Sequence, residues 1–568
     1  MNNANELQKI YVSRPFKTRN ADEYDLSAIL KLFVNPLDGL TTPFDFENSI
    51  IKGRMGSGKT MYLRANHAYY LFSLLPTLES GEPVILPVMI RLSDFQHLNT
   101  PQEIYRSIII KVIEELTSIY EHLQNVKDLG RIHMGMKSLV ADPAYMQKMG
   151  SALRKLVTLG SEEYVDKLTS EIGLKGGAKP GFFELSIDYK QTKFSEIKQK
   201  PNPGIKDIEE CYRRLFDDSD AKILLLIDEA GALDKQFFKE AESASLFEVL
   251  MNQFRTANFI RTKIALYPHS YSDILTETRY GDVVKLEENI YDITSYKGLR
   301  RRTIEIIANY TGQEEETVAA DEIFEIEAGN DFGDGVEQLI YASNGNLRRL
   351  IQLLDSAMSE AYAIHKGFGR VALDSCLLAL QKNSSRQEEQ YTVVDRDFLE
   401  VLSSVCKSRS TFRFQFPYMS PVLSKFTNRS QEFNVINVLE LGSGRKGTTY
   451  AFDYSFCVSH DIPTHYLKNT EKIDRERSLK NGDWISRVSG ISNDIIEQAK
   501  IPGKINGEIE YANGKNAFVR GEDGKEYFTN VDYIIESDRE KPLTTGKAIR
   551  FFPTSFDSSS IAIAVEIL

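Results

Sequence analysis

Residues 53–60 read Gly53-Arg54-Met55-Gly56-Ser57-Gly58-Lys59-Thr60 and match the phosphate-binding pattern G-x-x-x-x-G-K-[ST] at every fixed position. Such a loop surrounds a triphosphate with backbone N–H groups, so glycine is needed where the chain bends and where a Cβ would block the phosphates. Lys59 would place its ammonium on the β- and γ-phosphates, and Thr60 would offer its hydroxyl to Mg²⁺ at the start of a helix. The predicted nucleotide-binding residues in this loop are Gly53, Gly56, Ser57, Gly58, Lys59 and Thr60.

The residues on either side predict a strand before the loop and a helix after it. Residues 46–51 end in the β-branched pair Ile50-Ile51, which is typical of a strand. Residues 60–75 carry apolar side chains at helical spacing and stop at Pro76, which predicts a helix that ends there. A glycine-rich surface turn is the alternative interpretation of residues 53–60, and this context disfavours it.

An acidic pair downstream forms a second nucleotide signature. Residues 222–227 are an almost purely apolar run that suits a fully buried parallel strand, and Asp228-Glu229 follows at its carboxyl end, where ligands bind on such sheets. Asp228 would hold Mg²⁺, and Glu229 would orient the attacking water as general base. The alternative is a simple helix cap after a core strand.

The order of elements from 25 to about 295 indicates one nucleotide-binding core. Residues 1–24 are expected to form an extended arm, and Ser27 to cap a short helix after it. A strand at 83–92 and a helix at 104–120 then continue a β-α-β-α order. Residues 121–205 interrupt this order as an insertion, which would contact a second copy of the chain or another protein, or would only elaborate the surface.

A third core strand is predicted at 262–267, and polar residues follow it. His269, with Ser270, is placed to sense the γ-phosphate, although an ordinary loop pair is an equal alternative. Arg279 is positioned like a catalytic finger that reaches the nucleotide of a neighbouring subunit. Arg300 to Arg302 compete with it for that role.

Residues 296–382 become helical and are expected to form a lid over the nucleotide. The turn Ser343-Asn344-Gly345-Asn346-Leu347-Arg348 stands before the third lid helix, so Arg348 would fold over the bound phosphates and act in catalysis. Without the motifs upstream, Arg348 would be interpreted as an ordinary solvated helix residue.

Together, these residues resemble the AAA+ ATPases of the origin-recognition and replication-initiator type, and more loosely the signal-transducing ATPases with numerous domains. The resemblance covers residues 25–382 and rests on Gly53 to Thr60, Asp228-Glu229 and Gly345-Asn346-Leu347-Arg348 within a helical lid. It implies Mg-ATP binding, slow hydrolysis, and a conformational switch between core and lid. The polar sensor that this family usually has after the third strand is not clearly matched.

Residues 390–468 are predicted to form a winged-helix domain, which initiator-type ATPases carry after the lid. Helices are expected at 394–406 and 430–441, followed by a hairpin tip at 442–447 and a strand at 448–454. DNA would be contacted by a helix starting near Arg429 and by a wing that carries Arg445 and Lys446. Protein packing is the alternative use of this domain.

The C-terminal residues change composition. A polar helical linker is expected at 469–501, and residues 503–568 alternate as five short strands separated by Asn-Gly and Asp-Gly turns, which suits an oligonucleotide-binding (OB) barrel. This segment resembles cold-shock domains, a resemblance that implies base stacking and leaves single-strand binding and protein contact as open alternatives. The residues concerned are Tyr511, Phe518, Phe528 and Arg520.

Length and charge limit the wider possibilities. The 568 residues suggest three to four domains, and a net charge of −12 excludes a protein that coats nucleic acid by bulk electrostatics. Four cysteines without zinc spacing are expected to be reduced, and no hydrophobic signal region or membrane-length apolar run is found, so a cytoplasmic location is expected.

The sequence therefore predicts an α/β P-loop protein with a lid, a winged helix and a small barrel. The favoured function is a Mg-ATP-dependent switch that couples ATP binding and hydrolysis to engagement of DNA or RNA, in genome maintenance or anti-phage defence. The alternative is a signalling scaffold whose ATP-dependent oligomerisation recruits protein partners without nucleic acid.

Overall fold

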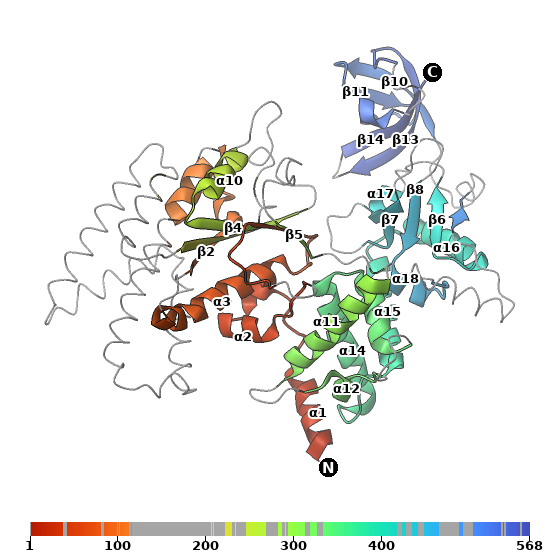
Figure 1. Cartoon of the computed structure of the whole chain (residues 1–568). Helices are drawn as coiled ribbons and strands as arrows, with labels where there is room; N and C mark the ends of the chain where they lie inside the picture. The colour runs from red at the N-terminus through yellow and green to blue at the C-terminus, as the bar shows by residue number, and fades with distance from the viewer. Residues whose placement is uncertain are drawn as a thin grey trace, which may run out of the picture.

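A computed structural model provides the fold, and Figure 1 shows its parts. The structure describes residues 2–568 with gaps, of which the longest are 116–205, 209–221, 234–245, 268–281, 465–487 and 492–503. The predicted insertion at 121–205 lies outside the described residues. The described residues form a core with a parallel sheet, a helical lid, a small mixed domain at 393–491 and a C-terminal barrel at 504–568.

The core sheet has five parallel strands in the order β2-β3-β4-β1-β5. Its strands are β1 (Ser49–Lys52), β2 (Ile85–Arg91), β3 (Lys222–Asp228), β4 (Ile260–Leu266) and β5 (Asp282–Lys285). Two separate hydrophobic clusters include the side chains of the apolar strand β3, because these alternate between the two faces of the sheet. This parallel sheet agrees with the predicted α/β fold class for this part of the chain.

Helices pack on both faces of this sheet. Helix α2 (Leu26–Leu32) and helix α3 (Lys59–Ser80) lie on one face, and α10 (Leu246–Thr256) lies on the other (Figure 1). Asp25, not Ser27, caps α2, because its side chain accepts a hydrogen bond from the Ala28 N–H at 2.8 Å. Helix α3 also continues past Pro76, which removes a single backbone hydrogen bond one turn before the helix ends.

The lid is helical, as predicted. It contains α11 (Ile293–Thr311), α12 (Ala320–Ile323), α13 (Gly335–Ser343), α14 (Leu347–His365) and α15 (Leu373–Glu388). Asn344 takes a left-handed conformation with φ 50° at the end of α13, and Asn346 caps α14 by accepting a hydrogen bond from the Arg349 N–H. Residues 344–346 therefore connect the two helices in a short turn that ends one helix and caps the next.

The N-terminus does not form the extended arm that we expected. Residues 2–13 form helix α1 (Asn2–Ser13), whose apolar residues Leu7, Ile10 and Tyr11 recur at helical spacing and pack against the lid. The Tyr11 hydroxyl donates to the Gly369 carbonyl at 2.9 Å, and Arg14 pairs with Asp355 at 2.7 Å. Burial of this apolar stripe stabilises the helix, so the N-terminus is part of the lid.

In the described part of the 393–491 domain, three helices combine with a sheet in the order β7-β8-β6-β9. Its elements are α16 (Val393–Ser408), β6 (Arg413–Phe416), α17 (Ser424–Thr427), β7 (Ile436–Glu440), β8 (Thr448–Phe452), α18 (Tyr454–Ser459) and β9 (Ser489–Gly490). The predicted helix at 430–441 is wrong, because its described part is strand β7, which pairs antiparallel with β8. Strand β9 lies in the stretch predicted as a linker and pairs with β6.

The lid and the 393–491 domain share one hydrophobic core. A single cluster of buried side chains runs from Ile10 of α1 through the lid to Phe456 of α18 and Ile491. Because this cluster is continuous across both parts, they pack as one unit.

The C-terminal residues close into the predicted five-stranded barrel, with the strand order β10-β11-β12-β14-β13. Its strands are β10 (Ile505–Ala512), β11 (Asn516–Gly521), β12 (Glu526–Asn530), β13 (Ala548–Phe556) and β14 (Ser559–Ile567). Gly514 and Gly524 have positive φ values of 87° and 79° in the connecting turns, a conformation that glycine adopts without strain. The barrel has its own hydrophobic core around Ile509, Val519 and Phe551.

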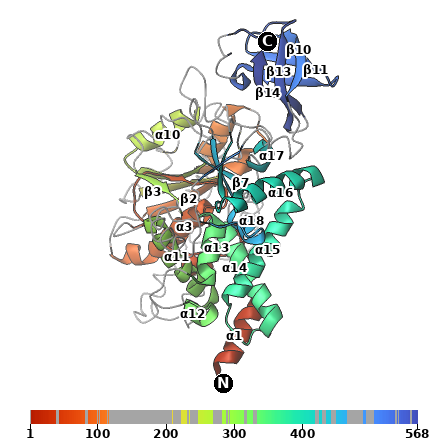
Figure 2. The same ribbon diagram turned by 90° about the vertical axis from the view of Figure 1, so that its right-hand side faces the viewer.

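The two ends of the molecule are α1 and the barrel. Both views place α1 at one end and the barrel at the other, with the lid and the 393–491 domain between them (Figures 1 and 2). Among the described residues, none of the helices combines the length and the apolar character needed to cross a membrane.

Candidate nucleotide site

The loop at 53–60 joins β1 to α3 and has the backbone that its glycines require. Gly56 and Gly58 have φ values of 80° and 94°, a region that other residues rarely adopt. A Cβ on Gly53 would lie 2.1 Å from the Ser57 Oγ. All three glycines are therefore needed for the shape of the loop.

Lys59 is buried at the start of α3 and is held by the loop itself. Its Nζ donates to the Gly53 carbonyl at 2.6 Å and to the Arg54 carbonyl at 2.8 Å. The same ammonium lies 4.1 Å from the centre of the Tyr267 ring, just after β4. The cation is thus fixed beside the turn that would receive the phosphates.

Asp228 and Glu229 lie at the carboxyl end of β3, as predicted. The Asp228 carboxylate is 3% exposed, and this burial raises its pKa above the ordinary value, although a hydrogen bond with Thr60 acts in the opposite direction. Glu229 has a φ of 58°, and its N–H donates to Asp228 Oδ1 at 2.8 Å. The left-handed conformation turns the Glu229 side chain away from the line of the strand.

Ser93 holds the Glu229 carboxylate by donating a hydrogen bond from its hydroxyl. Ser93 belongs to the short helix η2 (Leu92–Phe95), which directly follows β2. Arg91 and Asp228 are register partners on β2 and β3, so the residues that follow these two strands lie side by side. Ser93 was not among the residues predicted from the sequence, although a polar residue at the end of a core strand is the signal that could have identified it.

Thr60 and Asp228 form a donor set that fits Mg²⁺. A threonine hydroxyl and a carboxylate, already hydrogen-bonded to each other, provide the hard oxygen ligands that this ion prefers. The first turn of α3 and the end of β3 bring the two residues together from positions that are far apart in the sequence.

The lid is fastened directly to the phosphate loop. Asn346 donates from Nδ2 to the Met55 carbonyl at 2.7 Å, and the Arg348 N–H donates to the Gly56 carbonyl at 3.0 Å. Arg54 returns a hydrogen bond to the Asn344 carbonyl at 3.3 Å. A Cβ on Gly56 would lie 2.5 Å from Asn346 Oδ1, so this glycine allows the contact between loop and lid as well as the bend of the loop.

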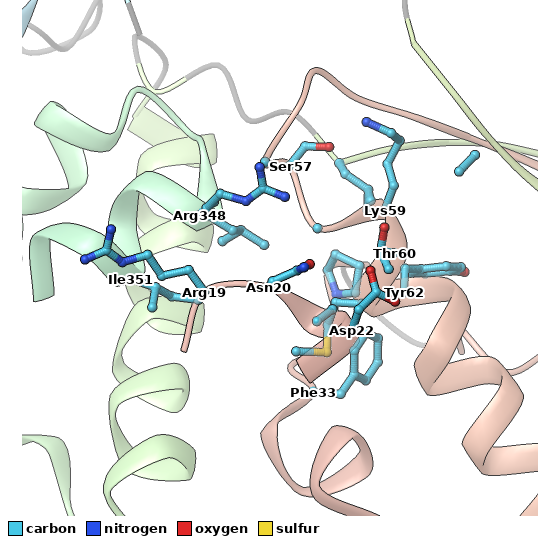
Figure 3. Close-up of a pocket in the computed structure, with 18 of the residues that line it drawn as sticks. Arg19, Asn20, Asp22, Phe33, Ser57, Lys59, Thr60, Tyr62, Arg348 and Ile351 are labelled. Carbon is cyan, nitrogen blue, oxygen red and sulfur yellow. The ribbon is translucent and has the colours of Figure 1, made fainter. Parts of the chain in front are cut away.

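One cavity of about 300 Å³ joins these groups. In Figure 3, Arg348 extends from the lid toward the loop that carries Ser57, while Lys59 and Thr60 lie on the same loop and helix. Asp228, Glu229 and Tyr267 complete the polar end. An apolar end is formed by side chains before β1 and on the lid, namely Phe33, Val34, Pro36, Ile306, Tyr310 and Ile351.

The N-terminal segment at 19–24 also lines this cavity, which the sequence did not indicate. Arg19, Asn20 and Asp22 lie along the cavity in Figure 3. Asp22 pairs with Arg91 at 2.6 Å, and Arg64 of α3 donates to the Tyr24 carbonyl at 2.8 Å. The segment is therefore anchored to the core at one end and, through α1, to the lid at the other.

Several predicted site residues lie outside the described residues. These are His269, Arg279, Arg429, Arg445 and Lys446. Of the other basic residues near the predicted DNA-binding surface, Arg409 donates to the Gly490 carbonyl at 2.8 Å, and Lys407 donates to the His460 carbonyl at 3.3 Å. These two residues therefore have partners within the 393–491 domain.

The barrel brings the three predicted aromatic residues together. Tyr511 pairs with Phe518 across β10 and β11, and Phe518 pairs with Phe528 across β11 and β12, with 5.7 Å between the last two ring centres. Tyr511 is 58% exposed and Phe518 is 41% exposed. Arg520 lies beside them but is bound to Glu510 across the strands, by a contact of 3.2 Å from Nη2 to Oε2 among others.

Comparisons with known proteins give matches among solved structures. No protein-family model matches the sequence, and no curated protein matches it. Among solved structures, the chain is similar to the ORC1 protein of Aeropyrum pernix in complex with DNA, with a TM-score of 0.30 and 10% identity, over 80% of this chain and 94% of that one. It is similar at the same TM-score and identity to the ORC2 protein of Aeropyrum pernix, described as ADPNP-ADP complexes, over 78% of this chain and 94% of that one.

Proposed function

We propose that this chain is a Mg-ATP-dependent switch ATPase of the AAA+ type that couples ATP binding and hydrolysis to engagement of DNA or RNA. The observation that carries the proposal is that the glycine loop, the carboxylates after β3 and the lid arginine line one cavity. An ordinary glycine-rich surface turn would not lie beside an acidic pair, and its backbone would not be hydrogen-bonded to a lid.

The phosphate end of the cavity supports ATP chemistry. The Lys59 ammonium donates hydrogen bonds to loop carbonyls and could donate to phosphate oxygens in their place when nucleotide binds. Arg348 lines the same cavity from the lid. Mg²⁺ on Thr60 and Asp228 would neutralise charge on the β- and γ-phosphates. Glu229 would accept the proton of the attacking water, and Ser93 would hold its carboxylate in position.

The apolar end of the cavity supports an adenine base. Phe33, Val34 and Pro36 face Ile306 and Ile351 of the lid, so a flat aromatic ring would be enclosed between core and lid. In such an arrangement the bound nucleotide contacts both parts at once. ATP binding would therefore bias the relative position of core and lid, which is the physical basis of a switch.

Engagement of nucleic acid is supported by the barrel. Three aromatic side chains occupy adjacent register positions on one face, and two of them are clearly exposed, as a surface for base stacking requires. We also propose that the 393–491 domain contacts DNA through Arg429, Arg445 and Lys446, that His269 senses the γ-phosphate, and that Arg279 acts in trans.

The direct test measures ATP turnover by the full chain with no nucleic acid, with a single-stranded oligonucleotide and with a duplex. We expect slow basal hydrolysis that changes several-fold when nucleic acid binds, together with binding that weakens as salt is raised. If no nucleic acid tested bound to the chain or changed its ATP turnover, coupling of ATP hydrolysis to nucleic-acid binding would be excluded. Nucleotide-dependent oligomers in light scattering would then favour the signalling scaffold.

A further inference from the structure

Two successive arginines at the start of α14 face different parts of the molecule. Arg348 lines the nucleotide cavity, whereas Arg349 is buried and points to the 393–491 domain. The Arg349 guanidinium donates to both carboxylate oxygens of Asp453, each at 2.7 Å, and also to the Ser455 hydroxyl at 3.3 Å. The side chains of Arg349 and Asp453 are 3% and 1% exposed.

Hydrogen bonds continue from this pair in both directions. Toward the phosphate loop, the Arg349 N–H donates to Asn346 Oδ1 at 3.0 Å, and Asn346 Nδ2 donates to the Met55 carbonyl. Toward the other domain, Asp453 accepts from the Ser455 N–H at 3.0 Å, and its own N–H donates to the Val435 carbonyl at 2.8 Å. The phosphate loop and the 393–491 domain are thus joined through the first turn of one helix.

A buried guanidinium without its carboxylate would have to move toward water, because an unpaired charge in the interior is strongly unfavourable. Arg349, Arg348 and Asn346 lie in the same turn, so a shift of the Arg349 backbone toward water is passed on to the other two residues. Loss of Asp453 would therefore displace the turn that presents Arg348 to the cavity and holds the loop.

We propose that the ion pair between Arg349 and Asp453 is a positioning contact for the nucleotide site, through which the 393–491 domain holds Arg348 over the phosphates. Nucleotide affinity then depends on a domain whose described residues contribute no group to the cavity. By thermodynamic linkage, a ligand that displaces the 393–491 domain weakens ATP binding, and ATP opposes that displacement. This inference rests on the proposed ATP site.

The lid contains a matched control. Arg300 and Asp334 form a second buried, two-point ion pair, with one contact of 3.0 Å, and both residues belong to the lid. Asp334 caps α13 as Asp453 caps α18. Replacing either aspartate by asparagine removes a comparable charge and keeps an oxygen that can cap the helix, but Asp453 pairs across to the lid whereas Asp334 pairs within it.

The experiment measures the dissociation constant of a fluorescent ATP analogue with Mg²⁺, using full-length protein well below the unfolding temperature. We expect Asp453→Asn to weaken binding about five- to tenfold, which is the usual size of coupling between sites. Asp334→Asn should change affinity less than about twofold while lowering Tm to a similar degree. Equal affinities for wild type and Asp453→Asn would overturn the proposal.

A double-mutant cycle separates positioning from general destabilisation. If Asp453 acts through Arg348, adding Asp453→Asn to Arg348→Ala should produce no further loss of affinity. A loss as large as that in the wild-type background would contradict the proposal. If Asp453→Asn does not fold, Arg349→Lys keeps the buried charge but loses the two-point contact; a smaller loss of affinity is then expected, and wild-type affinity would contradict the proposal.

A measurement without nucleotide keeps this inference separate from the proposed function. The Arg348 N–H is bound to the Gly56 carbonyl, so its hydrogen exchange reports directly on the contact between lid and loop. We expect faster exchange at Arg348 in Asp453→Asn but not in Asp334→Asn, and unchanged exchange would exclude the positioning role. Failure of the wild-type chain to bind any adenosine nucleotide would instead overturn the proposed function.

Discussion

The nucleotide cavity and the aromatic face of the barrel differ in how their functional side chains are held. In the cavity, Lys59 and Asp228 are buried; Lys59 donates to two loop carbonyls, and Asp228 accepts from the Glu229 N–H. On the barrel, Tyr511 and Phe518 are exposed, and the nearby cation Arg520 is bound to an acidic neighbour. In a preorganised, enclosed site, a few residues supply most of the binding free energy. On an exposed face, many weak contacts share it.

This contrast predicts that the largest effect of a single substitution falls on Lys59. Lys59→Ala should weaken binding of a fluorescent ATP analogue by more than about 100-fold, because charge-assisted hydrogen bonds to two phosphates are lost. Lys382→Ala removes a lysine that pairs with Glu360 on the lid surface and serves as the control. If Lys59→Ala binds the analogue as tightly as wild type, the cavity does not concentrate its binding free energy in a few residues as we expect.

Glu229→Gln should separate binding from hydrolysis. The amide cannot accept a proton from water, so steady-state turnover is expected to fall by about 100-fold or more while nucleotide affinity remains within about threefold of wild type. The two quantities are measured by phosphate release and by nucleotide titration. Turnover near the wild-type value would remove Glu229 as the general base.

The barrel face should respond more gradually. Phe518→Ala is expected to weaken binding of a single-stranded oligonucleotide about tenfold, the scale of one lost base stack, without changing ATP affinity. Phe368→Ala removes an aromatic side chain that is 58% exposed on the turn after α14 and should have no effect. Equal oligonucleotide affinity for Phe518→Ala and wild type, measured by fluorescence anisotropy, would argue that this face binds a protein instead.

The smallest expected effect comes from changing the charge beside Arg520 on the aromatic face of the barrel. Glu510→Gln removes the carboxylate that binds Arg520, and we expect single-strand affinity to rise about two- to threefold with a steeper dependence on salt. Glu566→Gln removes the acidic partner of Lys504 elsewhere on the barrel and is the matched control. A salt dependence equal to that of wild type would mean that Arg520 does not meet phosphate.

Local sequence patterns predicted much of the fold. The run before Asp228 is apolar at nearly every position and forms the buried strand β3, while alternation with Asn-Gly and Asp-Gly turns predicted the five-stranded barrel. The errors arose where tertiary contacts outweighed local preference. Helix α1 has an apolar stripe at helical spacing, but its burial depends on the lid; β7 depends on pairing with β8 and could not be predicted from its own residues.

The candidate site divides in the same way. The loop at 53–60 and Asp228-Glu229 could be identified because phosphate and Mg²⁺ chemistry require particular residue types at fixed spacing. The contacts that Ser93, Asn346 and the N-terminal segment make at the site were not predicted, since they form only after folding. For Ser93, the one local signal is its position directly after a core strand.

By itself, the sequence determined that this protein has a phosphate loop, an acidic pair after a buried strand, a helical lid and a small barrel. Only the tertiary structure decided that Arg349 meets Asp453 from 104 residues away and that the lid is hydrogen-bonded to the phosphate loop. The reason is physical: a motif is set by the local chemistry of neighbouring residues, whereas a buried ion pair between domains exists only once the shared core brings its two halves together.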